Sequence, residues 1–300
     1  MAHDTPIHYN ALSIDVEEYF QVSAFEASIA RDAWERWPSR VEFATGRLLD
    51  LFAERGVHAT FFTLGWVAER HPALIRRMVA EGHEVACHGY QHIRATTQSR
   101  AAFRADITLS KRLLEEAGGV EVRGYRAASF SIDRSNLWAF DELAAAGFAY
   151  SSSVYPVRHD LYGIPDAPRT PFRPLAGAPL VEIPVSTARF GTHNLPAGGG
   201  GYFRLLPYVL SRALVRRVNR AEARAANMYF HPWEFDPEQP RPTGVPAKSR
   251  FRHYLNQGRA LARMRRLLED FRWGPFRDVY ARAIAGLEPE IQHRDLSASS

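Results

Sequence analysis

Three short fragments, far apart in the chain, carry residues whose side chains could act together in catalysis. They are SIDVE at residues 13–17, HGYQH at 88–92 and YFHPWE at 229–234. Each places carboxylates or imidazoles at the end of a short apolar run of β-type residues. The first fragment supplies two carboxylates, the second a close histidine pair and the third a further histidine. That set is enough to bind one divalent metal ion and still leave an acid and a base to act on its bound water.

The histidine pair is the first part of this possible metal site. His88 and His92 are four residues apart and follow a predicted strand at residues 83–87. If the segment turns helically, both imidazoles lie on one side, as in other two-histidine metal pairs. The alternative is two loop histidines that only form hydrogen bonds. A carboxylate pair at another strand end favours the metal site.

The carboxylate pair offers two chemical roles. Asp15 and Glu17 are two residues apart, and a slight turn after the strand brings both to the same site. Beside a cation, one carboxylate can bind the metal while the other accepts a proton. The alternative is a solvated acidic loop that also includes Glu18.

Two further residues could complete a catalytic site. His231 lies between Phe230 and Pro232. A histidine in such a partly dry, aromatic environment can carry a proton to a leaving group, although a core histidine with satisfied hydrogen bonds is the alternative. Arg126 could hold a catalytic carboxylate through a bidentate pair, or form a purely structural ion pair.

The first half of the chain alternates short strands with amphipathic helices. We predict strands at residues 11–14, 58–64, 83–87, 122–126 and 148–150. We predict helices from 38–39 to 54 and at 67–80, 99–117 and 135–146. This alternation is typical of a parallel sheet, either open or closed into a barrel. In such a sheet, residues just past the carboxyl ends of the strands converge on one face. The candidates at such positions are Asp15, Glu17, His88, His92, Arg126 and His231.

The second half has a different pattern. Prolines cluster between residues 156 and 184, which indicates long ordered loops or short edge strands. The remaining predicted elements are strands at 180–185 and 228–231, a flexible glycine turn at 198–201, and helices at about 206–221 and 249–271. We predict one catalytic domain over residues 1–287, with an insert at 155–225, an extension at 240–287 and a frayed tail at 288–300.

The composition is that of a globular protein rather than a disordered or fibrous one. The net charge of +5 comes mainly from arginines, and no basic stripe is interleaved with aromatic residues, so nucleic-acid binding is not favoured. The single Cys87 excludes an internal disulfide framework. Neither a signal peptide nor a run of about 18 apolar residues is visible. We therefore expect a soluble cytoplasmic protein without a transmembrane segment.

The same fragments, in this order, resemble the polysaccharide deacetylase family, also called the NodB-homology domain. The resemblance covers most of the chain and rests on SIDVEEYF, ATFFTLGWVAERHPALIRRMVAEGHEVACHGYQH, RGYRAASFSI, GGGYFRLLPY and YFHPWEFDPEQPR. The chain looks most like the branch encoded with exopolysaccharide and exosortase (PEP-CTERM) loci. The family implies an α/β fold, a distorted (β/α) barrel often with seven strands, and a metal-dependent N-deacetylase.

The resemblance also implies roles for individual residues. Asp15 matches the catalytic base, Arg126 the arginine that orients this base, and His231 the catalytic acid. The residues that match the metal-binding triad are Glu17, His88 and His92.

The chain departs from the family's pattern in three places. Many members have two adjacent aspartates in the first motif, whereas Val16 occupies the second position here, so the ligand role falls to Glu17. Relatives often have an aspartate that tunes the acidic histidine, where this chain has Ser151 in the run YSSS at 150–153. The arginine motif has Ala127 and Ala128 in place of its usual prolines.

The mechanism that the resemblance implies uses a divalent metal, Zn²⁺ or another first-row ion such as Co²⁺, with one open position. Asp15 would take a proton from metal-bound water, whose pKa the metal lowers, and the hydroxide would attack an N-acetyl carbonyl. The metal and the backbone N–H of Ser129 would stabilise the oxyanion, and His231 would protonate the departing amine.

The expected substrate is an N-acetylated carbohydrate, namely the N-acetylhexosamine units of a polysaccharide or its precursor. Aromatic side chains could stack against its sugar rings, with core packing as the alternative for each of them. These residues are Tyr19, Phe20, Tyr155, Tyr202, Phe203 and Trp233. The glycines at 198–201 could form a loop over the groove.

Two other functions are consistent with the sequence. One is a different amide hydrolase on the same scaffold, opening a cyclic imide or ureide. The other is a metal-free carbohydrate-binding protein without catalysis, against which Asp15, Arg126 and His231 argue. If the protein is cytoplasmic, we expect it to act on a lipid-linked or nucleotide-linked precursor at the inner membrane face, in peripheral association with exopolysaccharide assembly machinery.

Overall fold

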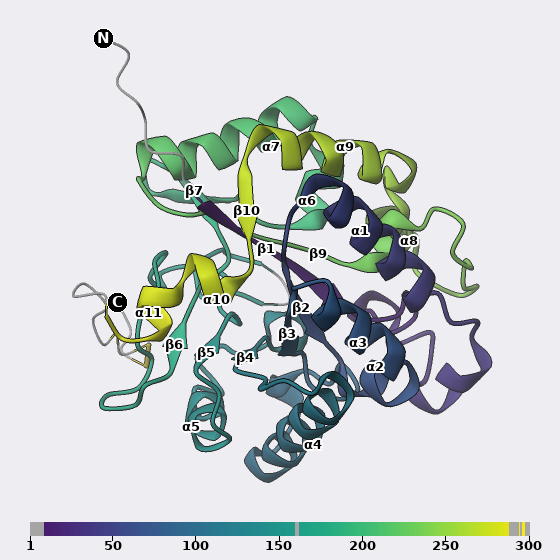
Figure 1. Cartoon of the computed structure of the whole chain (residues 1–300), viewed down its shortest axis with the longest axis horizontal. Helices are drawn as coiled ribbons and strands as arrows, with labels where there is room; N and C mark the ends of the chain where they lie inside the picture. The colour runs from purple at the N-terminus through teal and green to yellow at the C-terminus, as the bar shows by residue number, and fades with distance from the viewer. Residues whose placement is uncertain (1–8, 160–161, 288–293, 295, 298–300) are drawn as a thin grey trace.

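A curled parallel β-sheet forms the centre of the protein in a computed structural model that describes residues 9–159, 162–287, 294, 296 and 297 (Figure 1). Its strands are β1 (Tyr9–Val16), β2 (Thr60–Thr63), β3 (Glu84–Cys87), β4 (Gly124–Tyr125), β5 (Tyr150–Ser151), β6 (Val181–Glu182), β9 (Asn227–Phe230) and β10 (Arg272–Gly274). The pairings between them are parallel. Strands β2 and β3 are buried along their whole length, as expected of a parallel sheet with covered faces.

The residue Ala11 fixes the order of the strands around β1. It pairs with Asn227 of β9 and with Gly274 of β10, so these two strands lie on opposite edges of β1. Strands β10 and β2 therefore pair with the same edge of β1, at different residues, and β9 pairs with the other edge. The main path of the sheet runs β9-β1-β2-β3-β4-β5-β6. This seven-strand path confirms the predicted distorted (β/α) barrel. Strand β10 is an eighth strand that the sequence analysis missed.

The two ends of this path, β6 and β9, are joined by single contacts in place of a strand pair. The backbone N–H of Ser186 donates to the carbonyl of Asn227 at 3.3 Å, and the N–H of Asn227 donates to Ser186 Oγ at 2.7 Å. The Asn227 side chain also donates to Pro184 O at 3.0 Å and to Ser152 Oγ at 3.2 Å. Within the described residues the sheet is therefore a curled half-barrel, tied across its opening by one asparagine.

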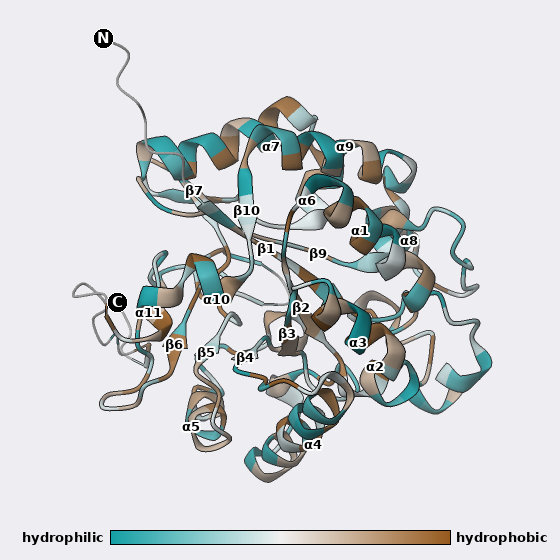
Figure 2. Cartoon of the chain, viewed as in Figure 1, coloured by the Kyte–Doolittle hydropathy of each residue, from teal (hydrophilic) through white to brown (hydrophobic). Residues whose placement is uncertain are grey.

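The helices cover the outside of the sheet (Figure 1). Those of the first half are α1 (Val41–Arg55), α2 (Gly65–Arg70), α3 (Pro72–Ala80), α4 (Arg100–Gly118) and α5 (Trp138–Ala145). Their apolar positions face inward and their polar positions face solvent, as the colouring of α4 in Figure 2 illustrates. No helix in the described part of the chain is both long and apolar enough to cross a membrane.

The single helix predicted at residues 67–80 was wrong, because the structure has two. Helix α2 ends before His71, whose backbone is not helical (φ −126°, ψ 53°), and α3 begins at Pro72. Proline restricts the residue before it to non-helical conformations and is favoured at the first position of a helix. The dipeptide therefore breaks an amphipathic pattern that looks continuous.

The second half also differs from the prediction. The glycine run at 198–201 is not a flexible turn, because Gly200 and Gly201 begin helix α6 (Gly200–Leu205). The predicted helix at 206–221 is α7 (Tyr208–Arg216) followed by a π turn, Arg217–Ala221. The predicted helix at 249–271 is two helices, α8 (Ala247–Tyr254) and α9 (Gln257–Asp270), separated by Asn256 in the left-handed region (φ 55°).

Several short elements were not predicted. They are the hairpin of β7 (Thr187–Phe190) and β8 (His193–Pro196), helices α10 (Phe276–Val279) and α11 (Ala281–Ile284), and 3₁₀ turns Ser23–Phe25, Arg31–Arg36, Ala95–Thr97, Ala128–Phe130 and Pro232–Phe235. Most of the tail predicted to fray, 288–300, lies outside the described residues.

The two glycines that begin α6 should respond differently to substitution. A Cβ at Gly200 would overlap the Glu234 carboxylate, whereas a Cβ at Gly201 meets nothing within 4 Å. We expect Gly200→Ala to lower the free energy of unfolding by about 1–3 kcal/mol through overpacking. Gly201→Ala should leave it unchanged or raise it by about 0.5–1 kcal/mol, because alanine favours helix. Urea unfolding of the two variants measures both effects, and equal effects would contradict the close approach of α6 to Glu234.

Candidate active site

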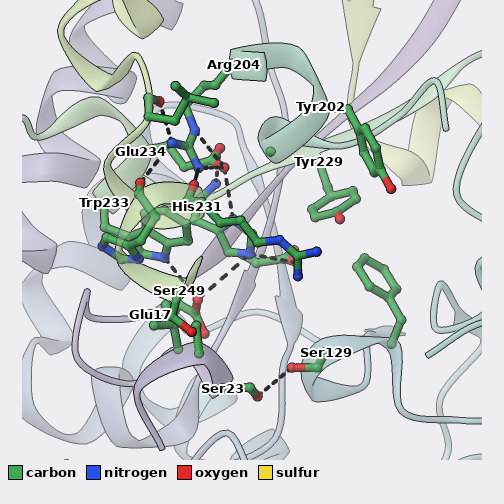
Figure 3. A pocket seen from close by; sticks show the side chains of 18 of the residues that line it. Glu17, Ser23, Ser129, Tyr202, Arg204, Tyr229, His231, Trp233, Glu234 and Ser249 are labelled. Carbon is green, nitrogen blue, oxygen red and sulfur yellow. Dashed lines mark hydrogen bonds and ion pairs between the residues drawn. The ribbon is translucent and has the colours of Figure 1, made fainter. Parts of the chain in front are cut away.

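The predicted base Asp15, the predicted acid His231 and the three predicted metal ligands line one pocket of about 430 Å³ at the carboxyl ends of the strands. Arg126, the third predicted catalytic residue, is fully buried and does not line it. Asp15 is the penultimate residue of β1, Glu17 follows that strand, and His88 follows β3. His231 follows β9 and precedes the 3₁₀ turn Pro232–Phe235. Figure 3 shows Tyr202 and Tyr229 on one side of this pocket and Trp233 and Glu234 on the other. The parallel topology therefore brings together the three fragments that are distant in sequence.

Three of these side chains form a group that could hold a metal ion. Glu17, His88 and His92 are buried, and each offers one ligand atom within 4.8 Å of the others. The Nε2 atom of His92 lies 2.9 Å from Glu17 Oε2. These are the residues that the sequence analysis selected as ligands.

Neighbouring groups orient these three side chains. The Nδ1 atom of His88 lies 2.8 Å from the carbonyl of Arg126, which can only accept, so Nδ1 carries the proton and Nε2 is left with a free lone pair. Trp233 Nε1 donates to Glu17 Oε1 at 3.0 Å, while Glu17 Oε2 is buried without a hydrogen bond among the described residues. This oxygen lies 2.9 Å from His92 Nε2 without a hydrogen bond between them, and a buried carboxylate oxygen in that position beside two imidazoles fits a divalent first-row cation such as Zn²⁺.

The protonation states of the group also suit a cation. Burial disfavours the ionised carboxylate of Glu17, but the neighbouring histidines, His92 above all, outweigh it and lower its pKa to about 2. Burial lowers the pKa of His88 to about 4. At neutral pH the carboxylate is therefore ionised and this imidazole neutral, which are the forms that bind metals.

Arg126 holds Asp15 in place. This arginine is fully buried, and its Nη1 atom lies 2.5 Å from Asp15 Oδ1 and 2.9 Å from Ser13 Oγ. Its Nε and Nη2 atoms donate to the carbonyl and hydroxyl of Ser152, both at 3.1 Å. The guanidinium also lies over the Phe62 ring, 4.0 Å from its centroid. The predicted pair of Asp15 and Arg126 is thus present, and the serine run of the sequence fixes the arginine.

His231 faces the carboxylates of Asp15 and Glu17 at the end of β1 and the carboxylate of Glu234 in its own turn. Its Nε2 atom lies 4.0 Å from Asp15 Oδ2 and 3.8 Å from Glu17 Oε1. Its Nδ1 atom lies 3.6 Å from Glu234 Oε1, and its backbone N–H donates to Glu234 Oε2 at 3.2 Å. Burial favours the neutral imidazole, but the contact with Glu234 and the charges of the nearby carboxylates outweigh it and raise the pKa of His231 to about 9.

Glu234 is a functional candidate whose role the sequence analysis did not identify. It is buried, and Arg204 of α6 donates to its Oε1 at 3.3 and 3.4 Å. The pKa of Glu234 is lowered because the charge of Arg204 and its contact with His231 outweigh its burial. The sequence signal was the spacing of His231 and Glu234, three residues apart. Glu234 contacts His231, the histidine for which many relatives provide an aspartate at the position that Ser151 occupies here.

Replacing Glu234 by Gln should move the alkaline limb of the pH profile of kcat/KM to lower pH. The Glu234 carboxylate favours the imidazolium of His231, so its removal lowers the pKa of His231 and the acid loses its proton at a lower pH. We expect a displacement of about one pH unit or more. Glu238→Gln, at an exposed glutamate of the same segment, is the matched control. An unchanged limb would show that Glu234 does not set the protonation of the acid.

The backbone around the pocket is unusual at three residues. His92, Ser129 and Phe130 have φ of 52°, 53° and 51°, in the left-handed region that non-glycine residues seldom adopt. Such conformations persist where the surrounding structure enforces them, often at functional sites. Ser129 also shares a hydrogen bond of 2.7 Å with Ser23 through their hydroxyls. Ser129 is one of the residues that line the pocket. Its role as an oxyanion donor stays a prediction.

The aromatic residues predicted to stack on sugars divide into two groups. Tyr202 is half-buried and lines the pocket, as predicted. Trp233 lines it too, but its ring stacks on His231 and His253, with centroids 4.8 and 4.1 Å away, and only 8% of the residue is exposed. Its indole N–H donates to Glu17. The predicted stacking on sugars was wrong for four residues that are buried and do not line this pocket, namely Tyr19, Phe20, Tyr155 and Phe203.

Other wall residues were not selected from the sequence. Phe130 and Tyr229 form an edge-to-face pair with centroids 4.7 Å apart. Leu205 of α6 and Phe251 of α8 line the outer part of the pocket. No local motif distinguishes these side chains from core residues, so only the fold could reveal them.

Two family models match consecutive parts of the chain. Residues 34–148 match the polysaccharide deacetylase model, and residues 152–281 match a domain of unknown function, DUF3473. The first match contains His88, His92 and Arg126, and the second contains His231 and Glu234.

Curated proteins similar to this chain include deacetylases. A chitooligosaccharide deacetylase from Bradyrhizobium sp. is 33% identical over 113 residues, 38% of this chain and 49% of that protein. A peptidoglycan-N-acetylglucosamine deacetylase from Bacillus cereus is 33% identical over 72 residues, 24% of this chain and 34% of that protein. The chain thus spans about half the length, or less, of these relatives.

Solved structures share the fold over nearly the whole chain. A structure from Mycobacterium smegmatis assigned to the polysaccharide deacetylases has a TM-score of 0.65 at 21% identity, covering 100% of this chain and 97% of that one. PuuE allantoinase has a TM-score of 0.58 at 20% identity, covering 94% and 91%. At these identities the likeness concerns the fold. Residues 34–148 thus match the polysaccharide deacetylase family, and the chain as a whole shares its fold with a solved structure assigned to that family.

Proposed function

We propose that this protein is a metal-dependent hydrolase that removes N-acetyl groups from N-acetylhexosamine units of a polysaccharide or its precursor. One observation carries the proposal. The base candidate Asp15 and the acid candidate His231 lie 4.0 Å apart, beside the buried group of Glu17, His88 and His92. The similarity to deacetylases over the first half of the chain supports an N-acetylated sugar as substrate.

The three-residue group would hold Zn²⁺ or another divalent ion such as Co²⁺. A metal bound there would act as a Lewis acid that activates water and polarises the amide carbonyl. Two imidazoles and one carboxylate leave further coordination positions for water and substrate.

The chain's own residues supply the proton transfers. Asp15, oriented by Arg126, accepts a proton from the attacking water. The water oxygen bonds to the acetyl carbon, the C–N bond breaks, and His231 donates a proton to the amine nitrogen. Its raised pKa of about 9 keeps His231 protonated at neutral pH. The products are acetate and a free amino sugar.

Other pocket residues would bind the substrate. The backbone N–H of Ser129 is our candidate donor to the carbonyl oxygen as negative charge develops on it. Tyr202 is our candidate for stacking against a sugar ring, because it is half-buried in the pocket wall.

We further propose that residues 1–287 act as one catalytic domain. Residues within both family matches line the same pocket, since His88 lies in the first and His231 in the second. The part matched by the domain of unknown function would therefore supply the acid. The exopolysaccharide role, the association with assembly machinery and the cytoplasmic location remain predictions, and cell fractionation tests the location.

The experiment is acetate release from N-acetylglucosamine oligomers, run beside ring opening of allantoin as the contrasting amide hydrolysis. We expect metal-loaded protein to release acetate and to leave allantoin intact. Allantoin opening without acetate release would instead support a ureide hydrolase. Oligomer binding without either reaction would support a binding protein.

A further inference from the structure

The side of the molecule formed by α6 to α9 carries a strong excess of positive charge. Residues 200–221 and 239–268 together contain thirteen Lys or Arg residues and no Asp or Glu. The rest of the chain has 25 basic and 33 acidic residues, so the net charge of +5 arises from these two segments. Figure 1 shows α6, α7, α8 and α9 grouped together on one side of the sheet.

Hydrogen bonds fasten these helices into one unit. Arg204 of α6 donates to the carbonyl of His253 at 2.8 Å and to that of Leu255 at 2.7 Å. Arg263 of α9 donates to the carbonyl of Phe203 at 3.0 Å and to that of Leu206 at 3.1 Å. The two acid-free segments therefore present a joint surface.

Large apolar side chains are exposed on the same unit. Leu205, Val209, Leu210 and Phe251 are 52%, 66%, 49% and 61% exposed. Leu205 and Phe251 also line the outer part of the pocket. Val209 and Leu210 do not line it but follow Leu205 within five residues of the chain. Exposed apolar residues grouped in this way mark an interaction surface, whereas single scattered ones need no explanation.

Exposed cations lie beside these apolar side chains on α8. Arg250 and Arg252 flank Phe251, are exposed, and form no ion pair with an acid of the described chain. Other arginines of the unit are already paired, as Arg212 is with Asp270 at 2.9 Å and Arg265 with Glu54. We call Leu205, Val209, Leu210, Arg250, Phe251 and Arg252 the basic–apolar face.

We propose that the basic–apolar face docks on an anionic lipid bilayer, with the pocket mouth turned toward the membrane. Apolar side chains inserted among headgroups, together with cations at an anionic surface, are the two signals that give stable peripheral binding. A soluble polyanion would attract the arginines but has no hydrocarbon for Phe251 and Val209. A second copy docked face to face would bring like charges together. The proposal does not depend on the reaction in the pocket.

The test is co-sedimentation of the full-length protein with sucrose-loaded vesicles of phosphatidylcholine alone or with phosphatidylglycerol. We expect binding to the anionic vesicles, weak binding to neutral ones, and partial release by salt. The double variant Val209→Ser/Phe251→Ser and the double variant Arg250→Ala/Arg252→Ala should each weaken the partition by about tenfold or more. Circular dichroism checks that the variants are folded.

Two matched controls make the result specific. Leu195→Ser removes an apolar side chain that is 44% exposed on β8, and Arg123→Ala removes an exposed arginine before β4. Both should bind like the unmodified protein. Failure of the folded protein to bind anionic vesicles at low salt would overturn the proposal. The proposal would also be overturned if the control substitutions weakened vesicle binding as much as the double variants do. It would likewise be overturned if the protein bound both heparin and anionic vesicles and the apolar substitutions left both kinds of binding unchanged.

Discussion

Replacing Asp15 by Asn is expected to lower kcat by about a thousandfold while leaving the metal content unchanged. Asparagine keeps the size of the side chain and can still contact Arg126, but it cannot accept the proton of the attacking water. Loss of a positioned general base typically reduces the rate by about 10²–10⁴. Acetate release and metal content are measured on the same purified sample.

The matched control for this substitution is Asp133→Asn. Asp133 follows the 3₁₀ turn at Ala128–Phe130 but is absent from the pocket wall. This variant should retain full activity. If Asp15→Asn retained full activity, the base would have to be another group, and Glu17 would be the nearest candidate. If Asp15→Asn lost its metal as well, Asp15 would be a ligand.

The second large effect is expected from His88→Ala, which should lose both metal and activity. His88 Nε2 is the candidate ligand atom, because Nδ1 is held by the carbonyl of Arg126. Removing one of three protein ligands leaves an incomplete coordination sphere, and acetate release should fall below detection. Metal analysis after dialysis against a weak chelator, together with the acetate assay, measures both losses.

His193→Ala provides the control for the histidine substitution. His193 is exposed on β8 and does not line the pocket, so its loss should change neither metal content nor turnover. Full metal content in both His88→Ala and His92→Ala would contradict the ligand assignment. His92→Ala alone retaining metal would reduce the site to Glu17 and His88.

Most of the candidate site could be predicted from sequence because the topology is regular. Once alternating strands and helices indicate a parallel sheet, Asp15, His88 and His231 must meet at the carboxyl ends of their strands. Short buried runs such as TFFT in β2 and EVAC in β3 lie between helical patterns, so the sequence indicated strands there.

The remaining features depend on contacts between distant segments. The Glu234 carboxylate occupies the space that a Cβ at Gly200 would need, so only glycine fits at the start of α6 without a shift. No local sequence pattern contains that information. From the sequence alone, Trp233 is predicted to stack on a ligand. Only the fold shows that its N–H donates to Glu17. Periodicity likewise continues across Asn256, whose left-handed conformation separates α8 from α9.

The departures from the family pattern have local explanations of the same kind. Ser152 binds the guanidinium of Arg126, so the serine run supports the arginine and not the acid histidine. Glu234, three residues after His231, provides the carboxylate beside the imidazole. The acid candidate His231 and the carboxylate beside it thus lie in one turn of the chain.

The measurement that tests the central claim most directly is reconstitution of activity by metal titration. The protein is stripped with a chelator, Zn²⁺ is added in steps, and acetate release from N-acetylglucosamine oligomers is followed with bound zinc in the same samples. We predict that activity rises linearly and levels off at one zinc per chain, and that His88→Ala shows neither tight binding nor activity. Acetate release that is undiminished in stripped protein, or one tightly bound zinc in His88→Ala, would contradict a metal centre formed by Glu17, His88 and His92.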